Sequence, residues 1–497
     1  MGTRSFVVAS MVLWCATCTA PTPPKGIEPE DPGARLYLRH CAICHGAAGD
    51  ADTVICELLL PRPNPFRQGL FKLVSTTNGM PTEDDLVTTL RRGMPGSTMM
   101  SWDWMGEPDL RALARYVRGL AIRGRAESIH QTAAVTGRRL DLTQATAIAE
   151  RELLPGPTVA IGQTIPPTAA TLAQGEQLFL RHCAACHGED GRGLPQTRDL
   201  PTDGTWLWPR DFTAGYLRGD ASHAALASRI LAGMPGAHMP NTRLAVAETE
   251  ALVAYVQSLI PEEADRRHVQ WRRSLRVARV ERLPQDDAGF AKVDAVRLPL
   301  TPLWWRQGAV DEVWLRAVHD GAELAVQLQW ADATEDDRAV PGRALGDGVA
   351  VQFTHEPDPP LFAMGSHDQP VNVWRWHAFD PRETAGITDL LDDTLHARLD
   401  SGLGLRTVPR VESTSFHGLD SVAEAAGGGL PLSAKARWAD GRWTVTFRRA
   451  LAARSPREVD LTSAQLVLFA VAVWDGTHDA HAGSKAITTW HSAELAR

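Results

Sequence analysis

Several features are scarce or missing in this 497-residue sequence. No apolar stretch after the N-terminal segment is long enough to cross a bilayer, so no membrane-spanning helix is expected beyond it. The net charge is −8, only 5 of the 51 basic residues are lysine, and no basic run occurs, which argues against a nucleic-acid partner. No nucleophile with its base and no pair of acid and base carboxylates stands out. The sequence therefore offers no catalytic group of its own.

Cysteine is also scarce, and its positions are informative. Of the 7 cysteines, four lie in two short motifs, Cys15 and Cys18 lie near the N-terminus, and Cys56 stands alone. None remains for an iron–sulfur cluster. We expect Cys56 to be a buried apolar thiol.

The two motifs are Cys41-Ala-Ile-Cys44-His45 and Cys183-Ala-Ala-Cys186-His187. Two cysteines three apart on a helical turn face the same edge of a flat ligand, and the next histidine projects onto its face. This is the attachment pattern of a c-type haem. A thioredoxin-type redox pair or half of a zinc site has the same C-x-x-C. However, the histidine follows at once in both copies and no further C-x-x-C could close a zinc site.

The repeat extends beyond these motifs. Leu36–His40 corresponds to Leu178–His182, and Gly93–Met99 corresponds to Gly233–Met239. Apolar residues recur with a helical period over Asp109–Leu120 and Val246–Leu259. These patterns predict two all-α domains, over residues 28–125 and 172–262, joined by a linker over residues 126–171.

Each predicted domain resembles a class I cytochrome c, in which a methionine before the last helix is the sixth iron ligand. The resemblance implies two covalent haem c groups, with His45 and His187 as axial ligands. It assigns Met239, followed by Pro240, and its partner Met99 as the opposite ligands. Met94, Met100 and Met105 are rivals in the first copy, because Met100 stands where the family has proline. Iron with both axial positions filled suits electron transfer rather than peroxide or oxygen chemistry.

The N-terminal segment, residues 1–20, has the features of an export signal. Arg4 precedes the apolar run Phe6–Trp14, and small residues follow. Export agrees with the resemblance, because c-type haem is attached outside the cytoplasm. Cys18 is a candidate lipid anchor, although Cys15 stands where the lipoprotein motif prefers leucine, and plain cleavage nearby is the alternative.

Beyond Asp265 the pattern changes to strands. Val313–Val318 and Glu323–Trp330 flank an Asp320-Gly321 turn, which is a strong hairpin signal. Similar runs follow to Val473. These features predict an all-β sandwich over residues 265–497. Composition alone would equally suit a carbohydrate-binding module.

Four short segments make the prediction more specific: Phe362–Gly365, Pro370–Trp376, Val471–Gly476 and Gly483–Trp490. They resemble the haem b-binding γ subunit of ethylbenzene dehydrogenase, a family that includes the γ subunits of chlorate and selenate reductases. The resemblance implies one non-covalent haem b held by Met364 and Lys485. A lysine ligand must be a neutral amine in a desolvated site. The rival ligands are His367, His377, His478, His481 and His491.

Together these resemblances imply a periplasmic or otherwise extracytoplasmic electron-transfer protein with two haem c and one haem b, and not an enzyme in its own right. The expected partners are the iron–sulfur and molybdopterin subunits of an oxidoreductase and other c-type cytochromes. Two alternatives remain open at this stage. One is a dihaem enzyme resembling cytochrome c peroxidase, and the other is a cytochrome fused to a sugar- or partner-binding sandwich.

Overall fold

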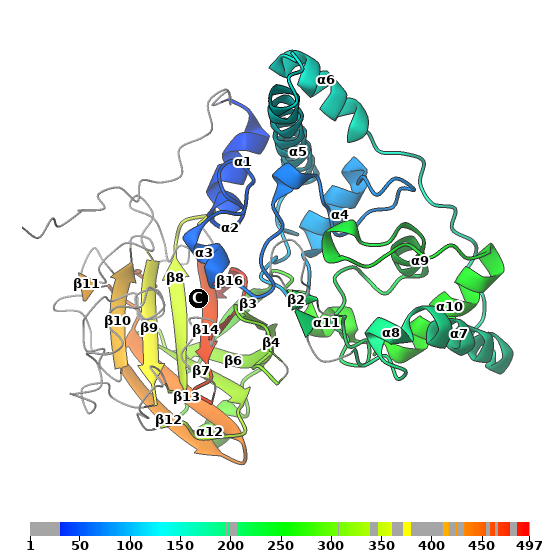
Figure 1. Cartoon of the computed structure of the whole chain (residues 1–497). Helices are drawn as coiled ribbons and strands as arrows, with labels where there is room; N and C mark the ends of the chain where they lie inside the picture. The colour runs from blue at the N-terminus through cyan, green and yellow to red at the C-terminus, as the bar shows by residue number, and fades with distance from the viewer. Residues whose placement is uncertain are drawn as a thin grey trace, which may run out of the picture.

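A computed structural model describes residues 30–193, 197–198, 206–207, 209–306, 308–337, 346–359, 371–378, 411–416, 424–425, 432–453, 458–462, 466–477 and 485–496. The predicted signal segment, Cys18 and Met364 lie outside these residues. Two helical domains and a strand-rich domain follow one another along the chain (Figure 1). The predicted multidomain architecture, two all-α domains before an all-β domain, is confirmed.

The first helical domain is built around the crossing of two helices. Its elements are α1 (Pro32–His40), α2 (Ala42–His45), α3 (Val54–Glu57), η1 (Phe66–Gln68), α4 (Glu83–Arg92), α5 (Glu107–Val135) and α6 (Leu142–Glu152). At the crossing, a Cβ on Gly33 of α1 would lie 2.3 Å from the Ala112 carbonyl oxygen of α5. Buried Tyr37 packs on Tyr116 one turn later, with ring centroids 5.1 Å apart. Only glycine allows the two backbones to approach this closely.

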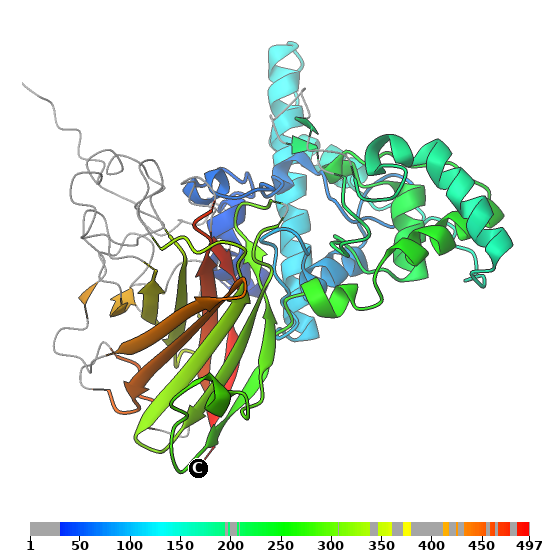
Figure 2. The same cartoon turned by 90° about the horizontal axis from the view of Figure 1, so that it is seen from below.

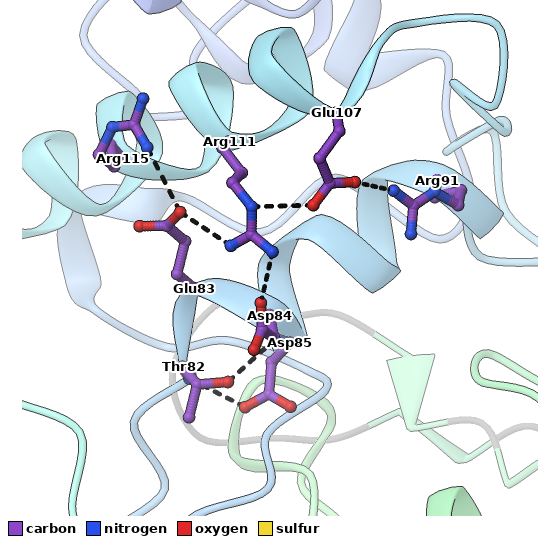
Figure 3. A network of polar contacts seen from close by, with 8 residues as sticks. All are labelled: Thr82, Glu83, Asp84, Asp85, Arg91, Glu107, Arg111 and Arg115. Atoms are coloured by element: carbon purple, nitrogen blue, oxygen red, sulfur yellow. Dashed lines mark hydrogen bonds and ion pairs between the residues drawn. The ribbon is translucent and has the colours of Figure 1, made fainter.

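Ion pairs on the surface fix α4 against α5 (Figure 3). The Thr82 side chain accepts from the Asp85 backbone N–H and the Asp85 side chain accepts from the Thr82 N–H, which caps the start of α4. Arg111 of α5 then contacts Glu83 at 3.0 Å, Asp84 at 2.9 Å and Glu107 at 2.8 Å. Each exposed pair contributes little alone, so the network mainly sets the orientation of the two helices.

Helix α5 continues well past Leu120, where the sequence pattern suggested an end. Ala126, on the extension, packs with Ala145 and Ala149 of α6. Part of the predicted linker is therefore a helical hairpin that belongs to the first helical domain. The one proline of α5, Pro108, lies in its first turn, where proline is tolerated. No further proline follows up to Val135, so nothing in the sequence stops the helix earlier.

The second helical domain repeats the same crossing. Its elements are α7 (Ala169–His182), α8 (Ala184–His187), β1 (Thr197–Arg198), β2 (Trp206–Leu207), α9 (His223–Ala232), η2 (Pro235–Ala237), α10 (Val246–Leu259) and α11 (Ala264–His268). A Cβ on Gly175 of α7 would lie 2.1 Å from the Ala251 oxygen of α10. Phe179 packs on Tyr255 as Tyr37 packs on Tyr116. The internal repeat seen in the sequence is thus a repeat of structure.

The strand-rich domain begins at β3. Its elements are β3 (Ser274–Arg279), α12 (Asp287–Phe290), β4 (Val296–Pro299), β5 (Thr301–Pro302), β6 (Glu312–His319), β7 (Glu323–Ala331), β8 (Gly348–Thr354), β9 (Val371–His377), β10 (Val411–Phe416), β11 (Glu424–Ala425), β12 (Ser433–Ala439), β13 (Arg442–Ala450), β14 (Val467–Trp474), β15 (Lys485–Ile487) and β16 (His491–Leu495).

These strands form one continuous sheet that curls over itself. The hydrogen-bonded order is β11-β10-β9-β8-β14-β16-β3-β6-β7-β13-β12, and β3 joins the two halves through parallel pairing with β16 and β6. The halves face each other around one core, which includes Leu315, Leu328, Val351, Trp374 and Val471. The predicted hairpin around Asp320-Gly321 is β6–β7.

The first helical domain lies between the sheet and the second helical domain (Figures 1 and 2). On the sheet side, Leu60 donates to the Leu303 oxygen at 2.9 Å, and His40 lies 2.9 Å from Asp358. On the other side, Arg92 pairs with Asp265 at 2.5 Å and donates to the Leu217 oxygen at 3.2 Å. Both neighbours therefore contact the first domain directly.

Candidate haem sites

The first C-x-x-C-H motif lines a cavity in the first helical domain. Helix α1 ends at His40, Cys41 caps it, and α2 carries Cys44 and His45. The Tyr37 hydroxyl donates to the Gly46 oxygen at 2.7 Å and holds the end of the motif against α1. Cys41, Cys44, His45 and Met99 all line one solvent-connected cavity of about 1120 Å³. The structure thus gathers the predicted attachment residues with the predicted axial methionine.

His45 is placed as a neutral imidazole. Its ring stacks on Phe66, with centroids 4.4 Å apart and planes 19° apart. Burial, and after it the charge of Lys72, lower the pKa of His45 to about 4. The neutral form is the one that can donate a nitrogen lone pair to a metal.

The methionine loop narrows the choice of axial methionine in the first copy. The Met94 N–H donates to the Met99 oxygen at 2.7 Å, and Gly93 adopts φ 71° to start the turn. Met94 and Met100 also line the cavity, whereas Met105 does not appear among its lining residues. The geometry therefore reduces the rivals without deciding among the remaining three.

The second helical domain contains the equivalent cavity. Cys183, Cys186, His187 and Met239 line a space of about 1170 Å³. Phe212 stacks on His187 at 4.6 Å and 19°, and burial lowers the pKa of His187. The Met234 N–H donates to the Met239 oxygen at 2.8 Å, which makes Met234 the counterpart of Met94 and Met239 that of Met99. This equivalence supports Met99 in the first copy.

Both cavities suit a c-type haem. Each has its two thiols and an imidazole in its lining, and each has a thioether in the methionine loop. Most of the remaining lining is apolar, including Leu86, Leu90 and Val117 in the first cavity and Leu226 and Ile230 in the second.

In the strand-rich domain, Lys485 lies at the start of β15. Backbone pairing places His377, Gly348, Trp474 and Lys485 in one row across β9, β8, β14 and β15. Directly paired residues share a face of the sheet, and the Lys485 Nζ lies 5.6 Å from the Trp474 ring centroid. The next row on the same face holds Arg375, Ala350, Ala472 and Ile487. The two small side chains, Ala350 and Ala472, thus lie at the centre of the row next to Trp474 and Lys485.

The rival histidines of this domain have different surroundings. His377 is buried on the other side of Trp474 from Lys485, with ring centroids 5.9 Å apart, and burial followed by the Arg375 charge lowers its pKa to about 3. His491 accepts from the Arg273 N–H at 3.1 Å through Nδ1. Met364, His367, His478 and His481 lie outside the described residues. Of the predicted haem b ligands, the structure therefore describes Lys485 alone.

The aromatic partners of His45 and His187 were not among the residues predicted from the sequence. Phe66 and Phe212 each end a Pro-x-x-Phe segment, Pro63–Phe66 and Pro209–Phe212. This repeat lies 21 and 25 residues after His45 and His187. It could have been found as a third repeated segment.

Three family models match successive parts of the chain. The model for cytochrome C oxidase, cbb3-type, subunit III matches residues 28–117, and the model for cytochrome c matches residues 172–259. The model for ethylbenzene dehydrogenase matches residues 413–486, which include Trp474 and Lys485 but not Met364. The predicted resemblance to two cytochrome c domains and an ethylbenzene dehydrogenase γ-like domain is confirmed.

Two relatives share parts of this chain. A Haloferax mediterranei protein named as a haem subunit of a respiratory nitrate reductase is 25% identical over 184 residues, 37% of this chain and 55% of its own length. The cbb3-type cytochrome c oxidase subunit CcoP of Rhodobacter capsulatus is 36% identical over 109 residues, 20% of this chain and 32% of its own length. The chain thus spans about half of the first relative and a third of the second.

Among solved structures, a chain of the reducing HAO-like protein complex of Kuenenia stuttgartiensis is 28% identical, with a TM-score of 0.38. The match covers 48% of this chain and all of that one. Within the part of the chain that the structure describes, no helix has the length and apolarity needed to span a membrane.

Proposed function

We propose that this chain, which joins two cytochrome c domains to an ethylbenzene dehydrogenase γ-like domain, is an exported electron-transfer subunit that carries two haem c and one haem b. Cys41, Cys44, His45 and Met99 would hold the first c haem, and Cys183, Cys186, His187 and Met239 the second. Met364 and Lys485 would hold the b haem. Each haem supplies one-electron redox chemistry, and the protein ligands fill its axial positions.

The observation that carries the proposal is the direct link between Lys485 and the first haem c site. The Leu303 N–H donates to the Lys485 oxygen at 3.0 Å, and the Leu60 N–H donates to the Leu303 oxygen at 2.9 Å. The Leu303 side chain packs in one cluster with Cys44 and Leu59. Only a short packed and hydrogen-bonded path thus separates a candidate ligand of the b haem from an attachment residue of the first c haem.

The contacts between the domains support one order of the three haems along the electron path. Both cytochrome domains contact the strand-rich domain, the second through the Tyr216 hydroxyl, which donates to Asp311 at 3.0 Å. Only the first places a haem-attachment residue, Cys44, in a described cluster with Leu303, so the expected haem sequence is b, first c, second c. By its resemblance, the γ-like domain would exchange electrons with an iron–sulfur subunit of a molybdopterin oxidoreductase. The relative named as a nitrate reductase haem subunit agrees with such a partner. The second cytochrome domain would then serve other c-type cytochromes.

The decisive experiment counts and separates the haems. Acid–acetone extraction of the purified protein should release one haem b per chain and leave two haems attached. Replacing Lys485 by Ala should remove or perturb the spectrum of the extractable haem only. Lys435→Ala is the matched control, because Lys435 is also in the strand-rich domain but is exposed on β12. An unchanged b-haem spectrum in Lys485→Ala would refute the assignment of this ligand.

The same preparation tests the two alternatives. A dihaem peroxidase would have a five-coordinate c haem that binds cyanide or peroxide in the native protein. A cytochrome fused to a sugar-binding sandwich would release no haem on extraction. Either result would replace the three-haem proposal, whereas copurification of a molybdenum-containing subunit would support it.

A further inference from the structure

The two cytochrome domains contact each other through reciprocal hydrogen bonds. The Asn64 Nδ2 of the first domain donates to the Gly236 oxygen in the second methionine loop at 2.7 Å. The Arg210 Nη2 of the second domain donates to the Gly96 oxygen in the first methionine loop at 2.9 Å. Each domain therefore contacts the methionine loop of the other.

These contacts use equivalent positions of the internal repeat. Asn64 and Arg210 are both the second residue of the Pro-x-x-Phe segment. Gly96 and Gly236 are both the last residue of the Gly-Met-Pro-Gly segment. Equivalent positions that contact each other in both directions are the property of an isologous, two-fold interface. The two domains thus pair as a homodimer would, within one chain.

The close approach depends on glycine at position 236, where an added Cβ would also lie 3.0 Å from the Leu70 oxygen, whereas at position 96 it would meet only the movable guanidinium of Arg210. A Cβ on Gly96 would lie 2.8 Å from the Arg210 Nη1, and a Cβ on Gly236 would lie 2.5 Å from the Asn64 Nδ2. Asn64 and Phe71 line the first cavity, and Gly236 donates its N–H to the Phe71 oxygen at 2.9 Å. The interface is therefore formed by the walls of the cavities themselves.

A group of cations lies where the two cavities meet. Lys72 lines the first cavity, and Arg210 and Arg218 line the second. The positive charges of Arg218 and Arg210 act on Lys72, whose pKa is lowered to about 7, mainly by burial. Burial also lowers the pKa of Arg218, to about 10. Among the described residues, no carboxylate forms an ion pair with Lys72 or Arg218.

A ligand that fills the cavities would remove water from these side chains. Burying a charge without a partner is costly, and placing like charges together adds to the cost. The cost is offset when the ligand supplies anions. A haem has two carboxylate side chains. Apart from the three cations, the walls of the two cavities are largely apolar, so the cations are the groups that these carboxylates would bind.

We propose that Lys72, Arg210 and Arg218 form one shared carboxylate-binding site for both c haems and hold the two cofactors as a directly coupled pair. The inference rests on the proposed function, because it requires a haem in each cavity. It names the residues that would hold the two haems next to each other. It also predicts that electrons pass between the two cytochrome domains across this junction.

The test is a spectroelectrochemical titration of the full-length, haem-loaded protein, compared with Lys72→Gln, Arg218→Gln and Arg115→Gln. Arg115→Gln is the matched control, because it removes one charge from the exposed surface of α5. Removing a cation favours oxidised haem. For a charge about 10 Å away at an effective dielectric constant of about 20, the ratio of reduced to oxidised haem should fall roughly tenfold at a fixed potential. For a one-electron couple this is about 59 mV.

The shared site predicts that Lys72→Gln and Arg218→Gln each lower the midpoint potential of both covalent haems, whereas Arg115→Gln changes neither and Lys72→Arg restores the wild-type values. A shift confined to the haem of the substituted domain would overturn the shared site. Equal potentials in all variants would overturn any carboxylate contact. A covalent haem count other than two in the wild-type protein would instead refute the proposed function, and a pyridine haemochrome assay reveals this before any titration.

Discussion

Replacing Gly33 by Ala is the most direct test of the helix crossing that positions the first haem site. The added Cβ would lie 2.3 Å from the Ala112 oxygen, whereas ordinary contact begins at 3.4 Å, so α1 and α5 must separate by about 1 Å. Overpacking of this kind costs roughly 1–3 kcal/mol, and the helical preference of alanine returns at most about 1 kcal/mol. We expect a net loss of roughly 1–2 kcal/mol in the stability of this domain.

Gly119→Ala is the matched control on the same helix. Nothing lies within 4 Å of a Cβ at Gly119, so alanine should stabilise α5 by about 0.5–1 kcal/mol. Unfolding of three domains is not two-state, so the appropriate assay is native-state hydrogen exchange read on α1 and α5. Exchange in Gly33→Ala should be about tenfold faster, and in Gly119→Ala slower. Equal effects of the two substitutions would refute the crossing argument.

Three further predictions concern other parts of the chain. Met239→Ala should let cyanide bind one haem of the haem-loaded protein, whereas Met234→Leu should not, as checked by absorption titration. Cyanide binding in neither variant, or in both variants, would contradict the assignment of Met239 as the axial ligand. Burial and the neighbouring carboxylate of Asp347 raise the pKa of Asp332 to about 7, so Asp332 binds a proton in the folded state that the unfolded chain releases above about pH 4. Its stabilising effect is thus present at low pH and lost as pH rises through 7. Asp332→Asn should therefore raise the stability of the strand-rich domain at pH 8 by on the order of 1–3 kcal/mol but hardly at pH 4, as checked by native-state hydrogen exchange read on β7 at each pH. Cys56 is 3% exposed and donates to the Cys44 oxygen at 2.8 Å, so it should resist maleimide in the folded protein, and Cys56→Ala should cost about 1 kcal/mol; rapid labelling would show that this contact does not persist.

Much of the site chemistry could be predicted from the sequence because it depends on short-range patterns. The spacing of Cys41, Cys44 and His45 fits one helical turn, and its repetition at Cys183 identifies a second domain without any structure. The helical period of Val246–Leu259 and the Asp320-Gly321 hairpin likewise depend on neighbouring residues, so α10 and the β6–β7 hairpin appear where the sequence placed them. Lys485 was predicted as an iron ligand only because the segment Gly483–Trp490 resembles a known family. Nothing in its neighbouring residues distinguishes it from a solvated lysine.

Other features depend on contacts between distant segments and could only come from the tertiary structure. The extension of α5 to Val135 is stabilised by packing against α6, which the period of α5 alone does not reveal. The curled sheet is closed by parallel pairing of β3 with strands about 40 and more than 200 residues away. The placement of Lys72 beside Arg210 and Arg218 depends on the contact between the two domains, in which Gly236 donates to the Phe71 oxygen and a Cβ at position 236 would lie 3.0 Å from the Leu70 oxygen. Sequence thus determined which cysteines, histidines and methionines line the two cytochrome cavities, and the packing of backbone against backbone decided how these cavities lie relative to each other.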